Sequence, residues 1–213
     1  MARYVPALRF RPLTRIYDPV VRATTREAEF KRRLLDQARI EPGHRVLDLA
    51  CGTGTLAIDA KRRAPRAELA GIDGDPEMLE RARAKAEAAG VEVRFDEGLS
   101  TALPYEDSTF DRVLSTLFFH HLDRAGKRAT IAEVARVLRP GGGLHVADWG
   151  KASDPLMGAL SWPVRLLDGL EVTRENFDGS LPAVLARGGL EDVAERDRMR
   201  TPLGSMVLLS ARA

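Results

Sequence analysis

A glycine-rich turn separates an apolar run from a helical pattern near residue 50. The run HRVLDLA is followed by Cys51-Gly52-Thr53-Gly54 and then by TLAIDAKRRA. Glycine lets the chain turn tightly, and it brings backbone amides close to a ligand beside the positive end of a helix. A dinucleotide turn has a third glycine, or alanine in its looser form, and this chain has Ala57 there. The turn therefore indicates a nucleotide ligand without selecting one.

An acidic residue, Asp73, ends the next apolar run, AELAGID, about twenty residues after the turn. A carboxylate in that position accepts hydrogen bonds from ribose hydroxyls. Dinucleotide-binding and other nucleotide-binding folds both satisfy this pattern. The alternative is that the glycine turn and the acid have only a structural role and bind no ligand.

These residues require strands and helices that hold them at one edge of a sheet. Apolar runs at 44–50, 67–73, 91–95, 110–116 and 144–149 predict strands. Helical patterns lie between them at 55–64, 76–90 and from 127 until Pro140 and the glycines that follow stop the helix. Strands separated by helices need crossover connections, so we expect a mostly parallel sheet with helices on both faces.

The end of the chain departs from this alternation. After a helix that begins at Leu181, strand-like runs at 192–199 and 205–211 are joined by a turn, which predicts an antiparallel hairpin. Residues 150–180 contain Pro155, Trp162 and Pro163, and we interpret them as an insertion on the substrate side. The predicted fold is α/β, a doubly wound, seven-stranded, mostly parallel sheet that ends in an antiparallel hairpin.

Length and composition favour one sizeable globular domain. The chain has 213 residues and a formal net charge of +2. It contains no run of about 18 apolar residues, so no membrane-spanning helix is predicted. Its single cysteine, Cys51, cannot form an internal disulfide or a structural zinc cluster, and we expect no metal site. The start, MARYVPALRFRPLTR, does not resemble a secretion signal, so the expected location is the cytoplasm.

Positive charge is concentrated near the N-terminus. Residues 1–40 hold ten basic and four acidic side chains, a net charge of +6, so residues 41–213 carry −4. We predict an N-terminal helical arm over 1–40 and a main domain over 41–213. The arm favours an anionic surface, and peripheral membrane contact is one interpretation. A solvated helix face is the other.

Four motifs occur in order: VLDLACGTGTLAI, GIDGDPEMLERAR, LPYEDSTFDRVLSTLFFHHL and RVLRPGGGLHVADW. Together they resemble the class I S-adenosylmethionine-dependent methyltransferases, particularly the group that contains the ubiquinone and menaquinone methyltransferases. The resemblance extends from about Tyr17 to the C-terminus. It implies a Rossmann-like fold, S-adenosyl-L-methionine as the cofactor, and methyl transfer by in-line displacement to a small-molecule or lipid-like acceptor.

The resemblance also assigns cofactor-binding positions. It places Asp48 near the methionine end of the cofactor, Asp73 at the ribose and Gly74 at the adenine. The remaining assigned positions are Ala50, Gly52 and Gly54 in the turn, Leu99 and Ser100 after the third strand, and Thr116 and Leu117 after the fourth.

One position departs from the family pattern. Gly98-Leu99 stands where the family has Gly-Asp, and that aspartate accepts a hydrogen bond from the adenine amine. Losing such a bond weakens binding by about 1.5–3 kcal/mol. We expect Asp96, Glu97 or a backbone carbonyl to substitute for it. This departure is the feature that favours the alternative function, a non-catalytic nucleotide-binding protein with the same fold.

Candidate catalytic residues follow from the position of the acceptor. Because a sulfonium is already a strong electrophile, the protein mainly supplies positioning and exclusion of water. An oxygen or carbon acceptor also needs a base. Of His120 and His121, which follow the fourth strand, we favour His121 as that base, with packing as the alternative role. Tyr17 in the N-terminal region resembles the family element that folds over the cofactor.

Other functions fit the sequence less well. A nicotinamide dehydrogenase is disfavoured by the missing third glycine and by the terminal hairpin. No nucleic-acid partner is expected, because the basic excess is confined to the arm and no recognition module accompanies it. The expected partner is a small-molecule or lipid-like substrate, and the expected assembly is a monomer or a homodimer.

Overall fold

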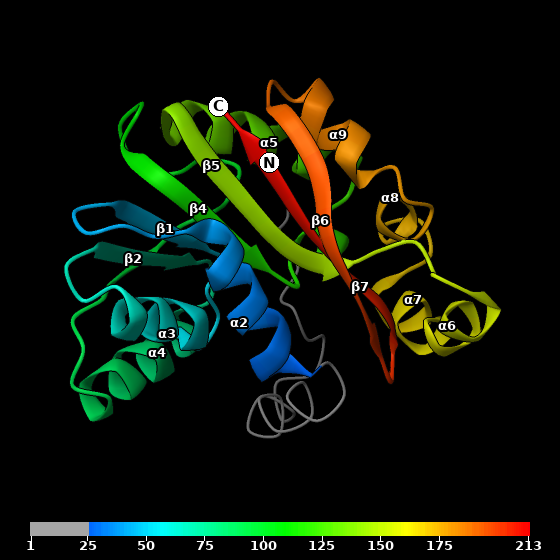
Figure 1. The fold of residues 1–213 in the computed structure, drawn as a ribbon, viewed down its shortest axis with the longest axis horizontal. Coiled ribbons are helices and arrows are strands. Elements are labelled where there is room, and N and C mark those ends of the chain that lie inside the picture. Colours follow the sequence, from blue (N-terminus) through cyan, green and yellow to red (C-terminus); the bar gives the residue numbers. More distant parts are fainter. Residues whose placement is uncertain (1–25) are drawn as a thin grey trace.

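Seven strands form one sheet with the order β3-β2-β1-β4-β5-β7-β6 in the computed structural model, which describes residues 26–213 (Figure 1). The strands are β1 (Arg45–Leu49), β2 (Glu68–Asp73), β3 (Arg94–Glu97), β4 (Phe110–Thr116), β5 (Leu138–Trp149), β6 (Glu191–Thr201) and β7 (Gly204–Arg212). The helices are α2 (Glu27–Ala38), α3 (Thr55–Arg63), α4 (Pro76–Ala88), the 3₁₀ turn η2 (Phe119–His121), α5 (Arg124–Val137), α6 (Pro155–Leu160), α7 (Trp162–Asp168), α8 (Arg174–Phe177) and α9 (Leu181–Arg187).

The pairing of the strands confirms the predicted fold class. Strands β1 to β5 pair in parallel, whereas β7 pairs antiparallel with both β5 and β6. Only Pro202 and Leu203 link β6 to β7, so the two strands form the predicted hairpin. The sheet is therefore mostly parallel, with an antiparallel end.

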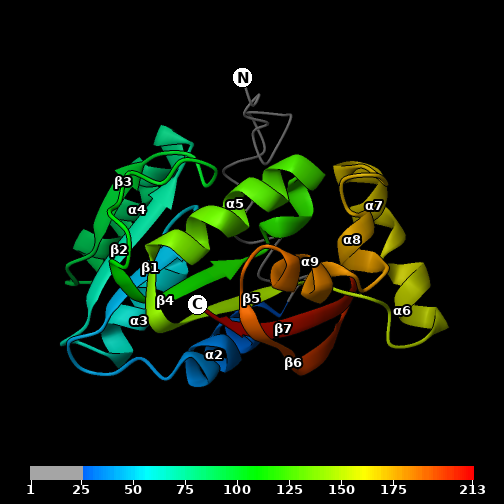
Figure 2. The same ribbon diagram turned by 90° about the horizontal axis from the view of Figure 1, so that it is seen from above.

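Helices cover both faces of the sheet (Figure 2). On one face, Phe30 and Leu34 of α2 and Leu56 of α3 pack against β1, β4, β5 and β7. On the other face, α5 and α9 contribute Ile131 and Leu185 to a core with the same central strands. Helix α4 packs beside α3 near β3. This three-layer arrangement leaves the carboxyl ends of the parallel strands as the edge where the connecting turns lie.

Two strand boundaries differ from the predictions. Strand β3 begins at Arg94 rather than residue 91, and β5 begins at Leu138 rather than residue 144. The predicted helix ends at Val137, ahead of Pro140, because a residue before proline is biased towards extended backbone. The segment after Pro140 then pairs with the chain end: Gly141 N donates to Ala213 O. Because of this long-range pairing, β5 includes Gly141, Gly142 and Gly143, although glycines in a row favour a turn when only the local sequence is considered.

Helix α2 begins within the predicted N-terminal arm, whose first 25 residues lie outside the described part of the chain. Its basic side chains have acidic partners in this protein: Lys31 pairs with Glu27, and Arg33 pairs with Glu29 and Asp197. The apolar side of α2 is fully buried on the sheet. Membrane contact through the arm, and the division into 1–40 and 41–213, stay predictions. Among the described residues, no helix has the length and apolar character needed to cross a bilayer.

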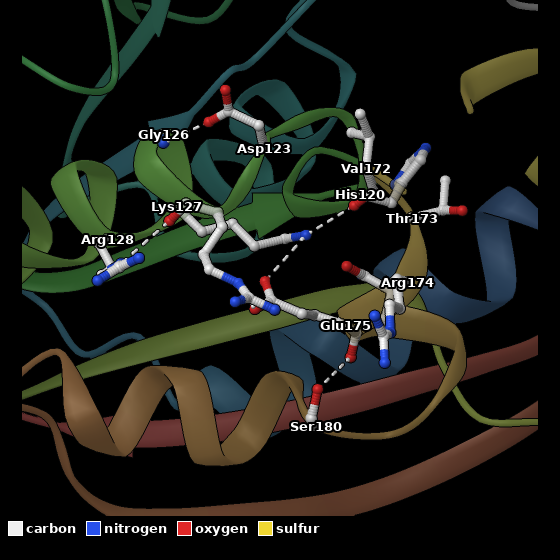
Figure 3. Close-up of polar contacts among 12 residues, drawn as sticks. His120, Asp123, Gly126, Lys127, Arg128, Val172, Thr173, Arg174, Glu175 and Ser180 are labelled. Carbon is white, nitrogen blue, oxygen red and sulfur yellow. Dashed lines mark hydrogen bonds and ion pairs between the residues drawn. The ribbon is translucent and has the colours of Figure 1, made fainter. Parts of the chain in front are cut away.

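Residues 150–180 form a helical segment, here called the cap, which holds α6, α7 and α8 beyond the carboxyl end of β5 (Figure 1). A buried ion pair ties the cap to α5: Lys127 Nζ lies 3.5 Å from Glu175 Oε2 and donates to Val172 O at 2.9 Å (Figure 3). Arg124 Nε donates to the other oxygen of Glu175 at 3.2 Å. These contacts fix the cap over the end of the sheet.

Candidate functional site

The strand order reverses between β1 and β4, which are neighbours at the centre of the sheet. In open α/β sheets, ligands bind outside the carboxyl ends of the strands at such a reversal. The cofactor positions assigned from the sequence follow β1, β2, β3 and β4. All four strands run parallel, so the fold brings these positions to one edge.

The turn after β1 adopts the strained backbone that its residues suggested. Ala50, Gly52 and Gly54 have φ values of 56°, 53° and 72°. An added Cβ at Gly54 would lie 2.8 Å from the ring of Phe95, so glycine is needed there for packing. At Gly52 an added Cβ would meet no atom within 4 Å. The backbone at Gly52 thus faces open space that a ligand can approach.

Asp73 at the end of β2 holds this turn in place. Its Oδ2 accepts a hydrogen bond from Gly52 N at 2.8 Å, and its Oδ1 accepts one from Asp75 N at 3.0 Å. Burial raises the pKa of the Asp73 carboxyl, although hydrogen bonds from the backbone N–H groups of Gly52, Asp75 and Gly74 oppose that shift. A carboxylate offers about four lone-pair sites, so Asp73 can still accept a further hydrogen bond. Asp73 can therefore brace the turn and bind a diol at the same time.

Asp48 is a buried acid on β1, two residues before the turn. It is 1% exposed, and its Oδ2 accepts a hydrogen bond from Ala57 N in the first turns of α3 at 3.1 Å. Burial raises the pKa of Asp48 to about 7, while the nearby charge of Lys31 lowers it in part. Asp48 consequently changes its charge near neutral pH, beside the position predicted for the methionine end of the cofactor.

The raised pKa of Asp48 predicts a pH-dependent stability. The folded state favours the protonated acid, so its contribution is complete below the unfolded pKa of 3.8 and is lost as pH rises through about 7. Between about pH 4 and about pH 8, the free energy of unfolding of the wild type should fall by up to about 4 kcal/mol more than that of Asp48→Asn. Urea denaturation of both proteins across this range measures the difference. Parallel curves for the two proteins would contradict the assignment.

The turns after β3 and β4 complete the edge. Leu99 is 41% exposed, and the Ser100 hydroxyl hydrogen-bonds Thr130 of α5 at 2.8 Å. Asp96, one suggested substitute for the missing acceptor, already accepts a hydrogen bond from Tyr105 Oη at 2.9 Å. After β4, Leu117 has a φ of 51°, and its N–H donates to Ala147 O. The cofactor contacts of Leu99, Ser100, Thr116 and Leu117 stay predictions.

The two histidines that follow β4 lie in different surroundings. His120 is 3% exposed, and its Nδ1 lies 2.6 Å from Oδ1 of the fully buried Asp148 on β5. His121 stacks obliquely on His120, with 4.0 Å between the ring centroids. Burial and the neighbouring His120 lower the pKa of His121 to about 3, so its ring is neutral at physiological pH. Its predicted role as a base is untested, as is that of Tyr17, which lies outside the described residues.

Sequence reasoning missed the acids around these histidines. Asp148 is the penultimate residue of the apolar run LHVADW, and that isolated acid in a buried strand was the available signal. Asp168 at the end of α7 faces both histidine rings, and nothing in its local sequence indicates this contact. Burial and the charges of Asp48 and Asp73 raise the pKa of the Cys51 thiol, so Cys51 stays protonated at neutral pH.

The cap presents apolar side chains to solvent. Of the large hydrophobic side chains that are exposed among residues 26–213, all but Leu99 belong to the cap: Leu156, Trp162, Leu166, Leu167 and Leu170. Met157, by contrast, is 4% exposed and packs inside. The apolar side chains of the cap are thus divided between an inner residue and an outer surface.

A seven-stranded sheet of this order, with a glycine turn after β1 and an acid after β2, defines the Rossmann-like methyltransferase class. Residues 46–142 match the family model described as a methyltransferase domain. The match agrees with the resemblance found in the sequence and with the cofactor that the resemblance implies, S-adenosylmethionine.

The chain is also similar to curated relatives, and it shares its fold with solved structures. The chain is 46% identical over 123 residues to a demethylmenaquinone methyltransferase of Thermus thermophilus, covering 58% of this chain and 55% of that protein. It is 40% identical over 131 residues to one of Deinococcus radiodurans, covering 62% and 54%. The matches therefore span about half the length of these relatives. A methyltransferase structure from Aquifex aeolicus shares the fold, with a TM-score of 0.70, 18% identity and 98% coverage of both chains.

Proposed function

We propose that this protein transfers the methyl group of S-adenosylmethionine to a small, lipid-like acceptor. The observation that carries the proposal is the interlocked turn at the β1–β4 reversal, where Asp73 braces Gly52 and keeps free acceptor sites. The match of residues 46–142 to the methyltransferase domain supports the same reaction.

The residues present fit the cofactor. Gly52 leaves open space at a strained turn, and the Asp73 carboxylate suits a ribose diol. Asp48 suits the ammonium group at the amino-acid end of the cofactor. The cofactor would supply an electrophilic methyl group on a positively charged sulfur: the acceptor's electron pair would form a bond to the methyl carbon as the carbon–sulfur bond breaks and the sulfur leaves as a neutral thioether. The chain itself binds, orients and excludes water from the reacting groups.

We propose that the acceptor binds beside η2 and the cap. We place His121 there as a residue that contacts the acceptor, since η2 directly follows β4 and faces Asp168 of α7. We also keep Tyr17 as a proposed contact. The exposed leucines and tryptophan of the cap supply an apolar surface next to this space, which suits an acceptor with a hydrocarbon tail.

The names of the relatives narrow the acceptor further. The proteins from Thermus thermophilus and Deinococcus radiodurans are demethylmenaquinone methyltransferases. We therefore propose a quinol-type ring with an apolar tail as the first acceptor to assay. The readout is transfer of labelled methyl from S-adenosylmethionine to such quinols. Absence of transfer to every quinol and amine lipid supplied would contradict the proposed reaction.

The apolar surface of the cap gives a prediction about tail length. The double variant Leu166→Gln and Leu167→Gln should raise the KM for a long-tailed acceptor about tenfold or more, because burying a leucine side chain is worth about 1.5–3 kcal/mol. The kcat should stay unchanged. A tail-less analogue of the same ring is the matched control, and its KM should not move. Equal effects on both acceptors would show that the cap does not bind the tail.

A non-catalytic binding protein is the second candidate function, and Leu99 is the observation that favours it. Leu99 offers no side-chain acceptor to an adenine amine, and Asp96 already bonds Tyr105. Such a protein would bind the cofactor without turnover. Methyl transfer to any acceptor excludes it.

A further inference from the structure

Three metal-ligating side chains converge where η2 meets the cap. The ring nitrogens Nε2 of His120 and Nδ1 of His121 and the carboxylate of Asp168 all lie within 4.8 Å of one another. His120 and His121 are successive residues of η2, whereas Asp168 ends α7, so the fold alone brings them together. None of the cofactor positions discussed above belongs to this cluster.

The carboxylate of Asp168 stands between the two rings. Its Oδ2 lies 3.6 Å from His120 Nε2, and its Oδ1 lies 3.7 Å from His121 Nδ1. Both separations are longer than a hydrogen bond. A tetrahedral zinc ion with bonds of about 2.0–2.1 Å holds its ligand atoms about 3.3–3.4 Å apart. The observed spacing therefore approaches that of ligands around one ion.

His120 is oriented as a metal-binding histidine. The fully buried Asp148 lies 2.6 Å from its Nδ1 and also accepts its backbone N–H at 3.2 Å. When Nδ1–H donates to Asp148, the lone pair of Nε2 points at the carboxylate of Asp168. Two acceptors then face each other, which is unfavourable unless a proton or a metal ion lies between them, and their separation of 3.6 Å is longer than a hydrogen bond. Metal-binding histidines characteristically donate their second ring N–H to a carboxylate in this way.

We propose that His120, His121 and Asp168 bind a divalent first-row transition-metal ion, with Asp148 fixing the orientation of His120. Two imidazoles and one carboxylate suit zinc and similar ions, and three protein ligands leave a coordination position for solvent. The side chains of His121 and Asp168 are 24% and 21% exposed, so solvent can reach that position. The site goes beyond the proposed methyl transfer, and as a proposal it departs from the expectation that the chain holds no metal.

The test measures metal binding directly. The full chain is treated with a chelator to remove metal and is then titrated with Co²⁺. The visible d–d bands report the coordination geometry, and equilibrium dialysis gives the number of ions bound per chain. We expect one Co²⁺ per chain, displaced by Zn²⁺. Asp168→Asn should weaken binding about 10- to 100-fold, since it removes the anionic ligand and keeps the side-chain shape. His44→Ala is the matched control, because His44 lies before β1 and bonds Glu41; its affinity should equal that of the wild type.

Two results would overturn the proposal. One is a wild type that takes up no more Co²⁺ than Asp168→Asn, which would mean that the three side chains do not bind a metal ion. The other is equal loss of binding in His44→Ala, which would locate the metal elsewhere. Circular dichroism of each variant verifies that it is folded. Neither result depends on cofactor binding or turnover, so the proposed function and the metal site are tested separately.

Discussion

Replacing Glu175 by alanine is expected to lower the free energy of unfolding by about 3–5 kcal/mol. The Lys127 side chain is 1% exposed, and Glu175 is its anionic partner across the junction of α5 and α8 (Figure 3). Removing the carboxylate leaves a buried charge whose remaining acceptor is Val172 O. Urea denaturation at neutral pH measures the loss.

Two further variants separate the ion pair from simple packing. The double variant Lys127→Met and Glu175→Met removes both charges, and it should lie within about 1–2 kcal/mol of the wild type because apolar replacement of a buried pair is often tolerated. Glu175→Gln should be intermediate, since an amide oxygen can still accept from Lys127. If Glu175→Ala and the double variant were equally unstable, packing rather than charge would hold the cap.

Replacing Asp73 by alanine is expected to weaken S-adenosylmethionine binding by about 100-fold or more. Each hydrogen bond from a ribose hydroxyl to the carboxylate is worth about 1.5–3 kcal/mol, and two hydroxyls are available. The variant also releases Gly52 N, which Asp73 holds at 2.8 Å, so the turn loses its brace. Isothermal titration of wild type and variant gives the ratio of dissociation constants.

Asp75→Ala is the matched control for Asp73. It removes an equal charge two residues away, where Asp75 caps α4 by accepting from Glu77 N at 2.9 Å. Loss of the cap should cost about 0.5–2 kcal/mol of stability with little change in cofactor affinity. Equal weakening by both variants would indicate a general charge effect and would remove Asp73 from the ribose site.

The fold was predictable because local and long-range signals agree in most elements. The runs at 67–73 and 110–116 match β2 and β4 closely, since each is apolar, short and followed by a helical pattern. The glycine turn and Asp73 could be placed together because parallel strands end at one edge. The hairpin of β6 and β7 followed from two strand patterns with no helix between them.

The contacts around η2 and the start of β5 could not be predicted to the same extent. His120 meets Asp148 and Asp168 through contacts that span 28 and 48 residues along the sequence, and no local pattern encodes such distances. The start of β5 was placed too late because Gly141 pairs with the chain end, a partner outside any local window. Sequence patterns thus place the glycine turn and Asp73 at one edge of the sheet, but they do not reveal the contacts made by His120.

Calorimetric titration of the purified full chain with S-adenosylmethionine, S-adenosylhomocysteine and NAD tests the central claim most directly. We predict binding of both sulfur compounds at a single site with micromolar dissociation constants, and no heat with NAD. Binding of NAD in preference to the sulfur compounds, or binding of none of the three, would contradict the assignment of the turn and Asp73 to this cofactor.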